Sequence, residues 1–212
     1  VKKILSSNHT VYTIDLLGCG NSDKPNLTYT NYLYVQLILD FIKDVIGERT
    51  DVVSSGASSG ILLMACSVQN DLIGKAVLVN PENLLISAKT PGKFAELYRT
   101  VICTPVIGTF LYNIMVNKKT IEKDFRLDYY YDQNKMYFYE ASQKHHTKGK
   151  YLYANINSGF TNTNIIHGLR NITQPIYIFT GKENPENILA ANQYQNYLPD
   201  THIVELEKTK RF

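Results

Sequence analysis

The chain has 212 residues, of which 44% are hydrophobic and 19% are charged. These values are typical of a globular protein with a buried core, and the length suits one α/β domain. The net charge of +3 comes from basic residues scattered along the chain, which argues against a nucleic-acid-binding surface. No apolar run is long enough to cross a bilayer, so we expect no membrane span.

The three cysteines, Cys19, Cys66 and Cys103, are odd in number and lie far apart. They form neither a disulfide framework nor a metal-ligand spacing, so we expect no metal and no other cofactor. Cys66 and Cys103 lie in apolar surroundings, where cysteine acts as a small hydrophobic residue. This usage favours a reduced, cytoplasmic location. The oligomeric state is left open by the sequence.

Strands and helices alternate in the first part of the chain. β-branched and aromatic runs predict buried strands, and apolar residues at helical spacing predict the helices between them. The order of these elements predicts a parallel sheet with helices on both faces. The predicted elements are a strand at 11–15, a helix from the N-cap Thr30 to Gly47, a strand at 51–55, a helix at 61–68 and a strand at 75–80.

Residues 86–165 interrupt this alternation. They contain nine of the sixteen tyrosines, and their eleven Lys and Arg against six Asp and Glu give a net charge of +5. We interpret this segment as a helical cap that is inserted over one end of the sheet. The alternation then returns, so residues 1–85 and 166–212 are predicted to form the two parts of the core. The returning elements are a strand at 175–181, a helix at 188–197 and a strand at 202–206.

The segment Gly56-Ala57-Ser58-Ser59-Gly60 follows a predicted strand and opens a predicted helix. Gly-x-Ser-x-Gly in this context is typical of a nucleophile elbow, which holds a serine hydroxyl on a sharp, strained turn. Ser58 is therefore the candidate nucleophile, and the backbone N–H of Ser59 is the candidate oxyanion donor. The alternative interpretation is a tight turn without a catalytic role. The order of the surrounding elements favours the elbow.

Several segments resemble the α/β-hydrolase fold superfamily. Asp15 to Pro25 is similar to the loop after its fourth strand, usually written Asp-x-x-Gly-x-Gly-x-Ser, and the elbow follows at the expected distance. The strands that end near Pro81 and Asn184 resemble the sixth and seventh strands. The resemblance is closest to the lid-bearing group of epoxide hydrolases, haloalkane dehalogenases and small esterases. It implies the α/β-hydrolase fold, a mostly parallel sheet flanked by helices with a helical cap insertion.

The resemblance also implies a triad of serine, acid and histidine in chain order, and this triad is degenerate. Asn184 stands at the acid position. Arg211 stands at the histidine position, and its guanidinium stays protonated and cannot accept a proton. Glu82 and Glu183 are the two alternatives for the acid. His202 lies at the start of the last strand and points to the wrong edge of the sheet, so we expect it on the surface.

In this fold the third strand lies between the fourth and the fifth and would precede Val1. We therefore expect the first strands to be missing and the chain to be a fragment or a decayed copy. The leading hypothesis is a serine hydrolase that acts on a small, mostly apolar carboxylic ester or related acyl compound. The competing hypothesis is a non-catalytic homologue with a binding or scaffold role, motivated by Asn184 and Arg211. Haloalkane or epoxide chemistry is disfavoured, because those enzymes place a carboxylate where Ser58 stands.

Overall fold

The computed structural model describes residues 5–117, 119–120 and 149–209. Its centre is a four-stranded sheet in the order β1-β2-β3-β4. Each strand runs parallel to its neighbour, so the carboxyl ends of all four meet at one edge, and the predicted parallel sheet is confirmed. The strands are β1 (Thr50–Ser55), β2 (Ile73–Val79), β3 (Ile176–Gly181) and β4 (His202–Leu206).

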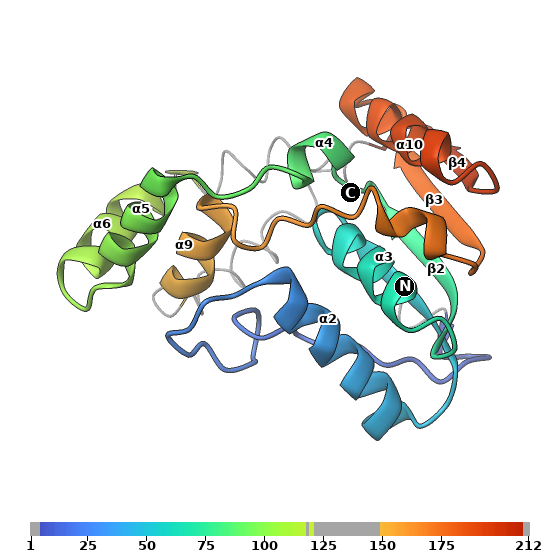
Figure 1. The fold of residues 1–212 in the computed structure, drawn as a ribbon, viewed down its shortest axis with the longest axis horizontal. Helices are drawn as coiled ribbons and strands as arrows, with labels where there is room; N and C mark the ends of the chain where they lie inside the picture. The colour runs from blue at the N-terminus through green and yellow to red at the C-terminus, as the bar shows by residue number, and fades with distance from the viewer. Residues whose placement is uncertain (1–4, 118, 121–148, 210–212) are drawn as a thin grey trace.

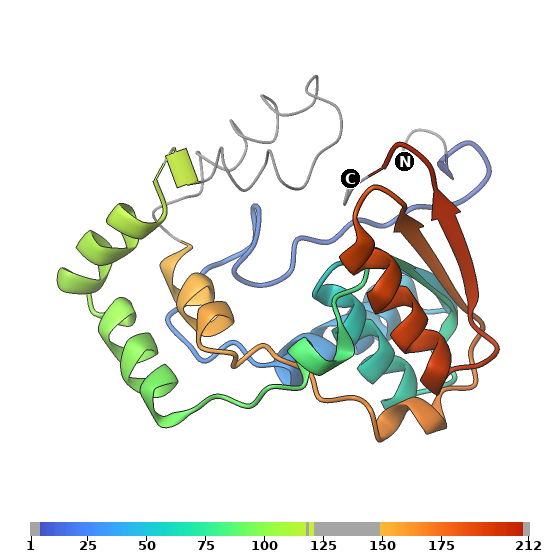
Figure 2. The same cartoon turned by 90° about the horizontal axis from the view of Figure 1, so that it is seen from above.

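Helices form two groups, one against the strands and one at the far end of the molecule (Figures 1 and 2). The helices are α2 (Asn31–Asp40) with the π-helix Phe41–Ile46 that continues it, α3 (Ser58–Val68), α4 (Leu84–Ser87), α5 (Lys93–Cys103), α6 (Ile107–Met115), α9 (Lys150–Asn157), the 3-10 helix Gly168–Asn171 and α10 (Pro185–Tyr197). In the first group, α3 packs on β1 and β2, α2 packs on α3, and α10 packs on β3. In the second group, α5, α6 and α9 pack on one another.

The helix predicted from Thr30 to Gly47 is confirmed at both ends. The Thr30 hydroxyl oxygen accepts the N–H of Leu33 at 3.2 Å, which caps the first turn. Gly47 adopts the left-handed conformation with φ of 75°, and its N–H donates to the carbonyl of Ile42 at 2.8 Å. Between these ends the helix buries Tyr34 and Ile42 in the same core as α3 and the sheet.

The strand predicted at residues 11–15 is wrong. The backbone there forms no strand, and the side chains of Tyr12 and Ile14 are 48% and 42% exposed. A β-branched and aromatic run favours a strand only where a neighbour supplies hydrogen bonds and cover. In the described residues β1 is an edge strand that pairs with β2 alone, so residues 11–15 join no ladder.

The described part of residues 86–165 is helical and contains no strand. It contacts the core through α9 and through the chain after α9, where Ile165 is buried in the core cluster. Asn155 in α9 is fully buried and donates from Nδ2 to the carbonyl of Leu27 at 3.4 Å. Its Oδ1 accepts from Nε of Arg99 in α5 at 3.0 Å, so one amide joins α9, α5 and the loop before α2. The boundaries of the cap remain a prediction.

Candidate functional site

The turn between β1 and α3 lies at the carboxyl edge of the sheet. β1 ends at Ser55 and α3 begins at Ser58, so Gly56 and Ala57 form the turn. Gly56 has φ of 58°, in the left-handed region that glycine adopts without a Cβ penalty. Its N–H donates to the carbonyl of Val79 at 3.1 Å, which fixes the turn to the end of β2. The chain therefore has the predicted order of strand, tight turn and helix, with Gly56 at the apex.

Ser58 is the first residue of α3 and is half-buried. We predicted a strained backbone at Ser58, and this is wrong. Among the described residues, only Asn80 and Lys208 have a positive φ without being glycine. The parallel pairing of Ser55 with Val79 carries β1 up to Ser55, so the left-handed residue comes directly afterwards. The sequence signal for this apex is that Gly56 is the first glycine after the β-branched strand.

Ser59 is fully buried under the turn. Its N–H, which we considered as an oxyanion donor, donates to the carbonyl of Gly56 at 3.1 Å. Its hydroxyl oxygen accepts from the hydroxyl of Ser54 at 3.3 Å. A ligand oxygen could accept a hydrogen bond from the Ser59 N–H only after the bond from this N–H to the Gly56 carbonyl had broken.

The second glycine of the Gly-x-Ser-x-Gly pattern has a packing role. A Cβ added at Gly60 would meet the Cβ of Thr163 at 3.4 Å, so the backbone of α3 and this side chain lie in close contact. Thr163 follows α9 in the chain and is 3% exposed. The segment around Thr163 therefore covers the first turn of α3.

The two candidate acids lie at the same edge of the sheet in different environments. Glu82 is half-buried, and its carbonyl accepts the hydroxyl of Tyr194 at 2.9 Å. Burial and the nearby charge of Glu82 raise the pKa of that tyrosine. Glu183 is exposed, and its N–H donates to the carbonyl of Thr209 at 3.2 Å. Within the described part of the chain, neither carboxylate forms a hydrogen bond with Ser58.

Asn184, at the predicted position of the triad acid, is the N-cap of α10. Its Oδ1 accepts the N–H of Glu186 at 3.0 Å, and Pro185 occupies the first helical position. The side chain thus stabilises the start of a helix. Arg211, at the predicted histidine position, lies outside the described residues.

The described histidines are all exposed, and one of them, His202, contacts a neighbouring strand of the sheet. The ring of His202 stacks on that of Tyr177 with 5.0 Å between centroids, at the amino end of β4. This is the surface position expected from the sequence. In the described residues, no group of three or more His, Cys, Asp or Glu could hold a metal ion. No helix in that same part of the chain is long and apolar enough to cross a membrane.

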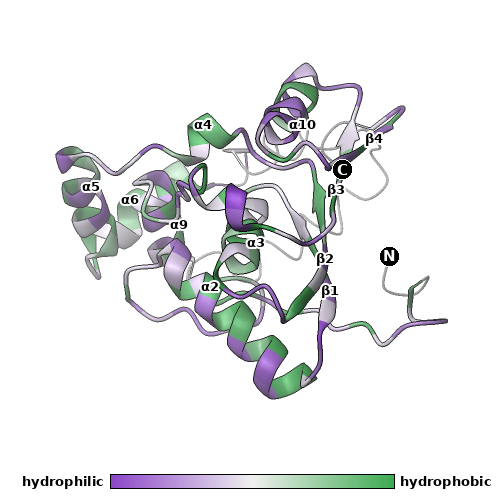
Figure 3. Ribbon diagram, turned by 45° about the vertical axis from the view of Figure 1, so that its right-hand side comes forward, coloured by the Kyte–Doolittle hydropathy of each residue, from purple (hydrophilic) through white to green (hydrophobic). Residues whose placement is uncertain are grey.

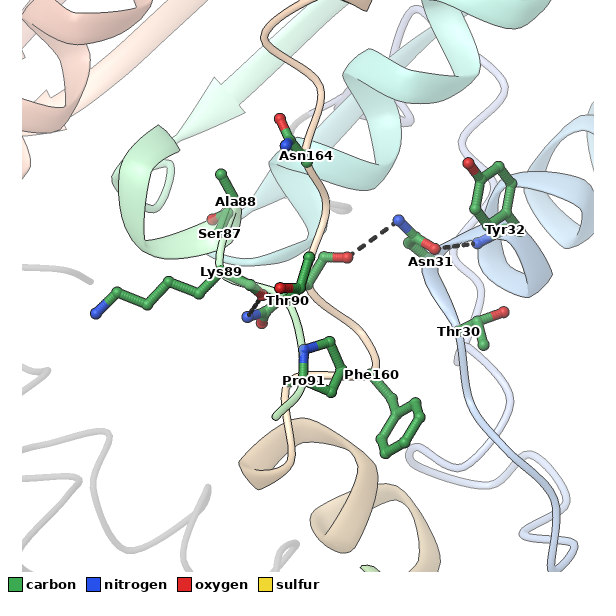
Figure 4. A pocket seen from close by; sticks show the side chains of 12 residues that line it. Thr30, Asn31, Tyr32, Ser87, Ala88, Lys89, Thr90, Pro91, Phe160 and Asn164 are labelled. Carbon is green, nitrogen blue, oxygen red and sulfur yellow. Dashed lines mark hydrogen bonds between the residues drawn. The ribbon is translucent and has the colours of Figure 1, made fainter. Parts of the chain in front are cut away.

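A cleft of about 330 Å³ lies between the start of α2, the chain after α4 and the chain after α9 (Figure 4). Asn162 links its walls: its carbonyl accepts from Nδ2 of Asn31 at 3.0 Å, and its own Nδ2 donates to the carbonyl of Lys89 at 2.7 Å. None of the predicted site residues lines this cleft. Thr163, which faces Gly60, lies in the chain between the lining residues Asn162 and Asn164.

Comparisons with known proteins agree on the architecture. The sequence model of the alpha/beta hydrolase family matches residues 3–209. A meta-cleavage product hydrolase from Pseudomonas fluorescens, a mutant complexed with acetates, is 15% identical, with a TM-score of 0.71 over 99% of this chain and 75% of its own. An esterase from Exiguobacterium antarcticum is 14% identical, with a TM-score of 0.68 over 92% of this chain and 72% of its own.

A bromoperoxidase from Bacillus anthracis is 13% identical, with a TM-score of 0.67 over 92% of this chain and 72% of its own. At these identities the likeness to solved structures concerns the fold alone. No curated protein matches the sequence significantly.

Proposed function

Because the chain belongs to the alpha/beta hydrolase family, we propose that it binds a small, mostly apolar ester or related acyl compound without cleaving it through a serine nucleophile. The observation that carries this proposal is the glycine at the apex of the elbow. In a nucleophile elbow, the residue on the sharp turn presents its side chain at the top of the sheet. Gly56 occupies that turn with φ of 58° and has no side chain to present.

The surroundings of the turn support the same proposal. Acyl transfer needs a base that takes the serine proton and donors that are free to bind the oxyanion. The N–H of Ser59 is bonded to Gly56, and Asn184 caps α10 instead of bearing a charge. By sequence, Arg211 stands where the base is expected, and a guanidinium cannot take that role.

The ligand class rests on the family and its solved relatives. An esterase and a hydrolase complexed with acetates are among the proteins of similar structure. A small carboxylic ester or acyl compound is the ligand these names suggest. The tyrosine-rich composition of residues 86–165 supports a mostly apolar ligand under the cap.

The second candidate function is hydrolysis of the same ligand class with Ser58 as nucleophile. It is favoured by one observation, the half-buried Ser58 at the first position of α3. A helix N-terminus stabilises negative charge that develops beside it. In this second reading Glu82 or Glu183 serves as the acid.

Turnover of p-nitrophenyl acetate, butyrate and octanoate separates the two functions. We expect the wild-type rate to equal that of Ser58→Ala, while methyl esters of the same acids raise the melting temperature of both proteins. Ser67→Ala, in the same helix, controls for the loss of a serine that has no proposed role. A rate that Ser58→Ala abolishes and Ser67→Ala keeps would establish the second candidate.

A gain-of-function experiment combines Gly56→Ser with Asn184→Asp and Arg211→His. If the turn is a nucleophile elbow that has lost its catalytic residues, the triple variant should gain ester turnover that Gly56→Ser alone lacks. Serine proteases that have lost a member of the triad still accelerate the reaction by about 10³–10⁴-fold over water, so a gain has to exceed that range.

A further inference from the structure

The cleft beside the start of α2 is built from three separate segments of the chain. Residues 30–32 at the start of α2 contribute one part of its lining. The chain that follows α4, residues 87–91, and the chain that follows α9, residues 159–164, contribute the others (Figure 4). The last two segments lie near the two ends of residues 86–165, the predicted cap. A ligand in this cleft would therefore contact both the core and the two connections of the cap.

Hydrogen bonds and one cation–π contact hold the walls of the cleft in place. On the α2 side, Oδ1 of Asn31 accepts the N–H of Tyr32 at 2.8 Å. On the opposite side, the N–H of Phe160 donates to the carbonyl of Asn155 at 3.0 Å. The guanidinium of Arg99 lies 5.6 Å from the centroid of the Phe160 ring. The cleft is therefore formed before any ligand enters, as is usual for small-molecule sites.

The lining contains one buried hydroxyl without a partner. Ser87 is 9% exposed and is the last residue of α4, a helix whose other residues are hydrophobic (Figure 3). Its backbone N–H donates to the carbonyl of Asn83 at 3.0 Å, whereas its hydroxyl forms no hydrogen bond with any residue that the structure describes. A buried hydroxyl costs free energy unless a partner satisfies it. An oxygen atom of a ligand in the cleft would supply the missing acceptor.

The charge and polarity of the lining select the class of ligand. In the part of the chain that the structure describes, no carboxylate lines the cleft, so a cation would find no counter-charge. The side chain of Lys89 is charged but extends away from the other lining residues (Figure 4). Phe160, Pro91 and Ala88 supply apolar surface. The volume of about 330 Å³ is at the small end of the range of about 300–1,000 Å³ for ligand pockets. These features favour a small, neutral, mostly apolar molecule with an acceptor oxygen.

We propose that the small ester or acyl compound binds in this cleft, with its carbonyl oxygen accepting the hydroxyl of Ser87 and its acyl chain against the apolar lining. The binding site rests on the proposed function for the class of its ligand and adds where that ligand lies. None of the residues predicted for catalysis lines the cleft, and none of the described histidines lines it and could take the proton of Ser87. An ester held here would therefore bind without being cleaved.

Titration of the whole chain with methyl butyrate, followed by two-dimensional ¹H–¹⁵N NMR, tests the place of binding. We expect the backbone amide signals of residues 87–90 and 159–164 to shift and those of residues 56–59 to stay unchanged. Sodium butyrate is the charged analogue. It should bind more weakly, because the charge of Lys89 points away from the cleft.

Two variants test the contacts in the same titration. Ser87→Ala removes one hydrogen bond and should weaken the affinity for methyl butyrate by roughly twofold to tenfold. Thr90→Trp places a large ring at the exposed side of the cleft and should weaken the affinity further. The matched controls are Ser67→Ala in α3 and Thr100→Trp in α5, which make the same changes outside the cleft and should bind like the wild type.

Two results would overturn the binding site and leave the proposed function in place. One is a shift of the amide signals of residues 56–59 while those around the cleft stay unchanged. The other is wild-type affinity in both Ser87→Ala and Thr90→Trp. Tighter binding of butyrate than of methyl butyrate, removed by Lys89→Gln, would overturn the neutral ligand. If methyl butyrate binds nowhere on the wild-type protein, the proposed function is wrong and this site with it.

Discussion

The side chain of Asn80 joins the ends of two neighbouring strands. Its Oδ1 accepts the N–H of Gly181 at 2.9 Å, and its own N–H donates to the carbonyl of Phe179 at 2.8 Å. Asn80 is 4% exposed and has φ of 44°, a left-handed conformation that asparagine tolerates better than most residues. It therefore holds the carboxyl edge of the sheet together beside the turn at Gly56.

Two substitutions at Asn80 separate its hydrogen bond from its backbone conformation. Asn80→Gly keeps the left-handed conformation and loses the amide, so we expect the free energy of unfolding to fall by about 1–3 kcal/mol. Asn80→Ala adds about 1–2 kcal/mol for a Cβ in the left-handed region. Urea denaturation measures both. An Asn80→Gly variant as stable as the wild type would show that the bond to Gly181 contributes no more than the backbone strain that glycine relieves.

The loop before α2 depends on a glycine that has no room for a side chain. Gly20 has φ of 44°, and a Cβ there would collide with the carboxylate of Asp15, whose Oδ2 accepts the N–H of Asn21 at 2.9 Å. Gly47 has φ of 75° and nothing within 4 Å of an added Cβ. Gly47→Ala should therefore cost about 1–2 kcal/mol of unfolding free energy for the conformation alone.

Gly20→Ala should cost more than Gly47→Ala, because the collision adds to the same conformational penalty. Thermal unfolding of both variants gives the comparison. Equal losses would mean that the loop shifts to accommodate the methyl group.

Alkaline pH should destabilise the protein through its buried thiol. Burial raises the pKa of Cys66 from its ordinary value of 9.0 to about 12. The folded state therefore keeps this proton where the unfolded state has lost it. The resulting stability is complete below pH 9 and is lost progressively as the pH rises toward 12.

Cys66→Ala isolates this contribution. The variant removes the titrating group and adds a packing loss that does not change with pH, so its unfolding free energy should fall less steeply than that of the wild type between pH 9 and pH 11. Denaturation by urea at several pH values tests this. Parallel curves for the two proteins would exclude Cys66 as a source of the alkaline loss.

Much of the fold could be predicted because local signals and tertiary contacts agree. The strand at 202–206 and the helix capped by Thr30 were both found where the pattern places them. The strand predicted at 11–15 does not form. Its composition favours a strand but does not show whether a neighbouring strand is present to pair with it. Strand formation depends on that partner more than on the residues themselves.

The site was harder to predict, because residues 54–60 are all small. In Ser-Ser-Gly-Ala-Ser-Ser-Gly the pattern Gly-x-Ser-x-Gly places Ser58 at the centre. The apex of the turn is set instead by where β1 stops, and that depends on the pairing of Ser55 with Val79. A long-range register of this kind cannot be derived from the segment itself, so the sequence predicted the tight turn but not that its left-handed residue is Gly56, two residues before Ser58.

The most direct test is the intact mass of the protein after incubation with a fluorophosphonate, which reacts with activated serine hydroxyls. An active serine esterase in the same reaction serves as the positive control. With Gly56 at the apex, we expect the esterase to gain the mass of the adduct and this protein to remain unmodified. An adduct on the wild type that maps to Ser58 and disappears in Ser58→Ala would contradict the proposed loss of serine catalysis.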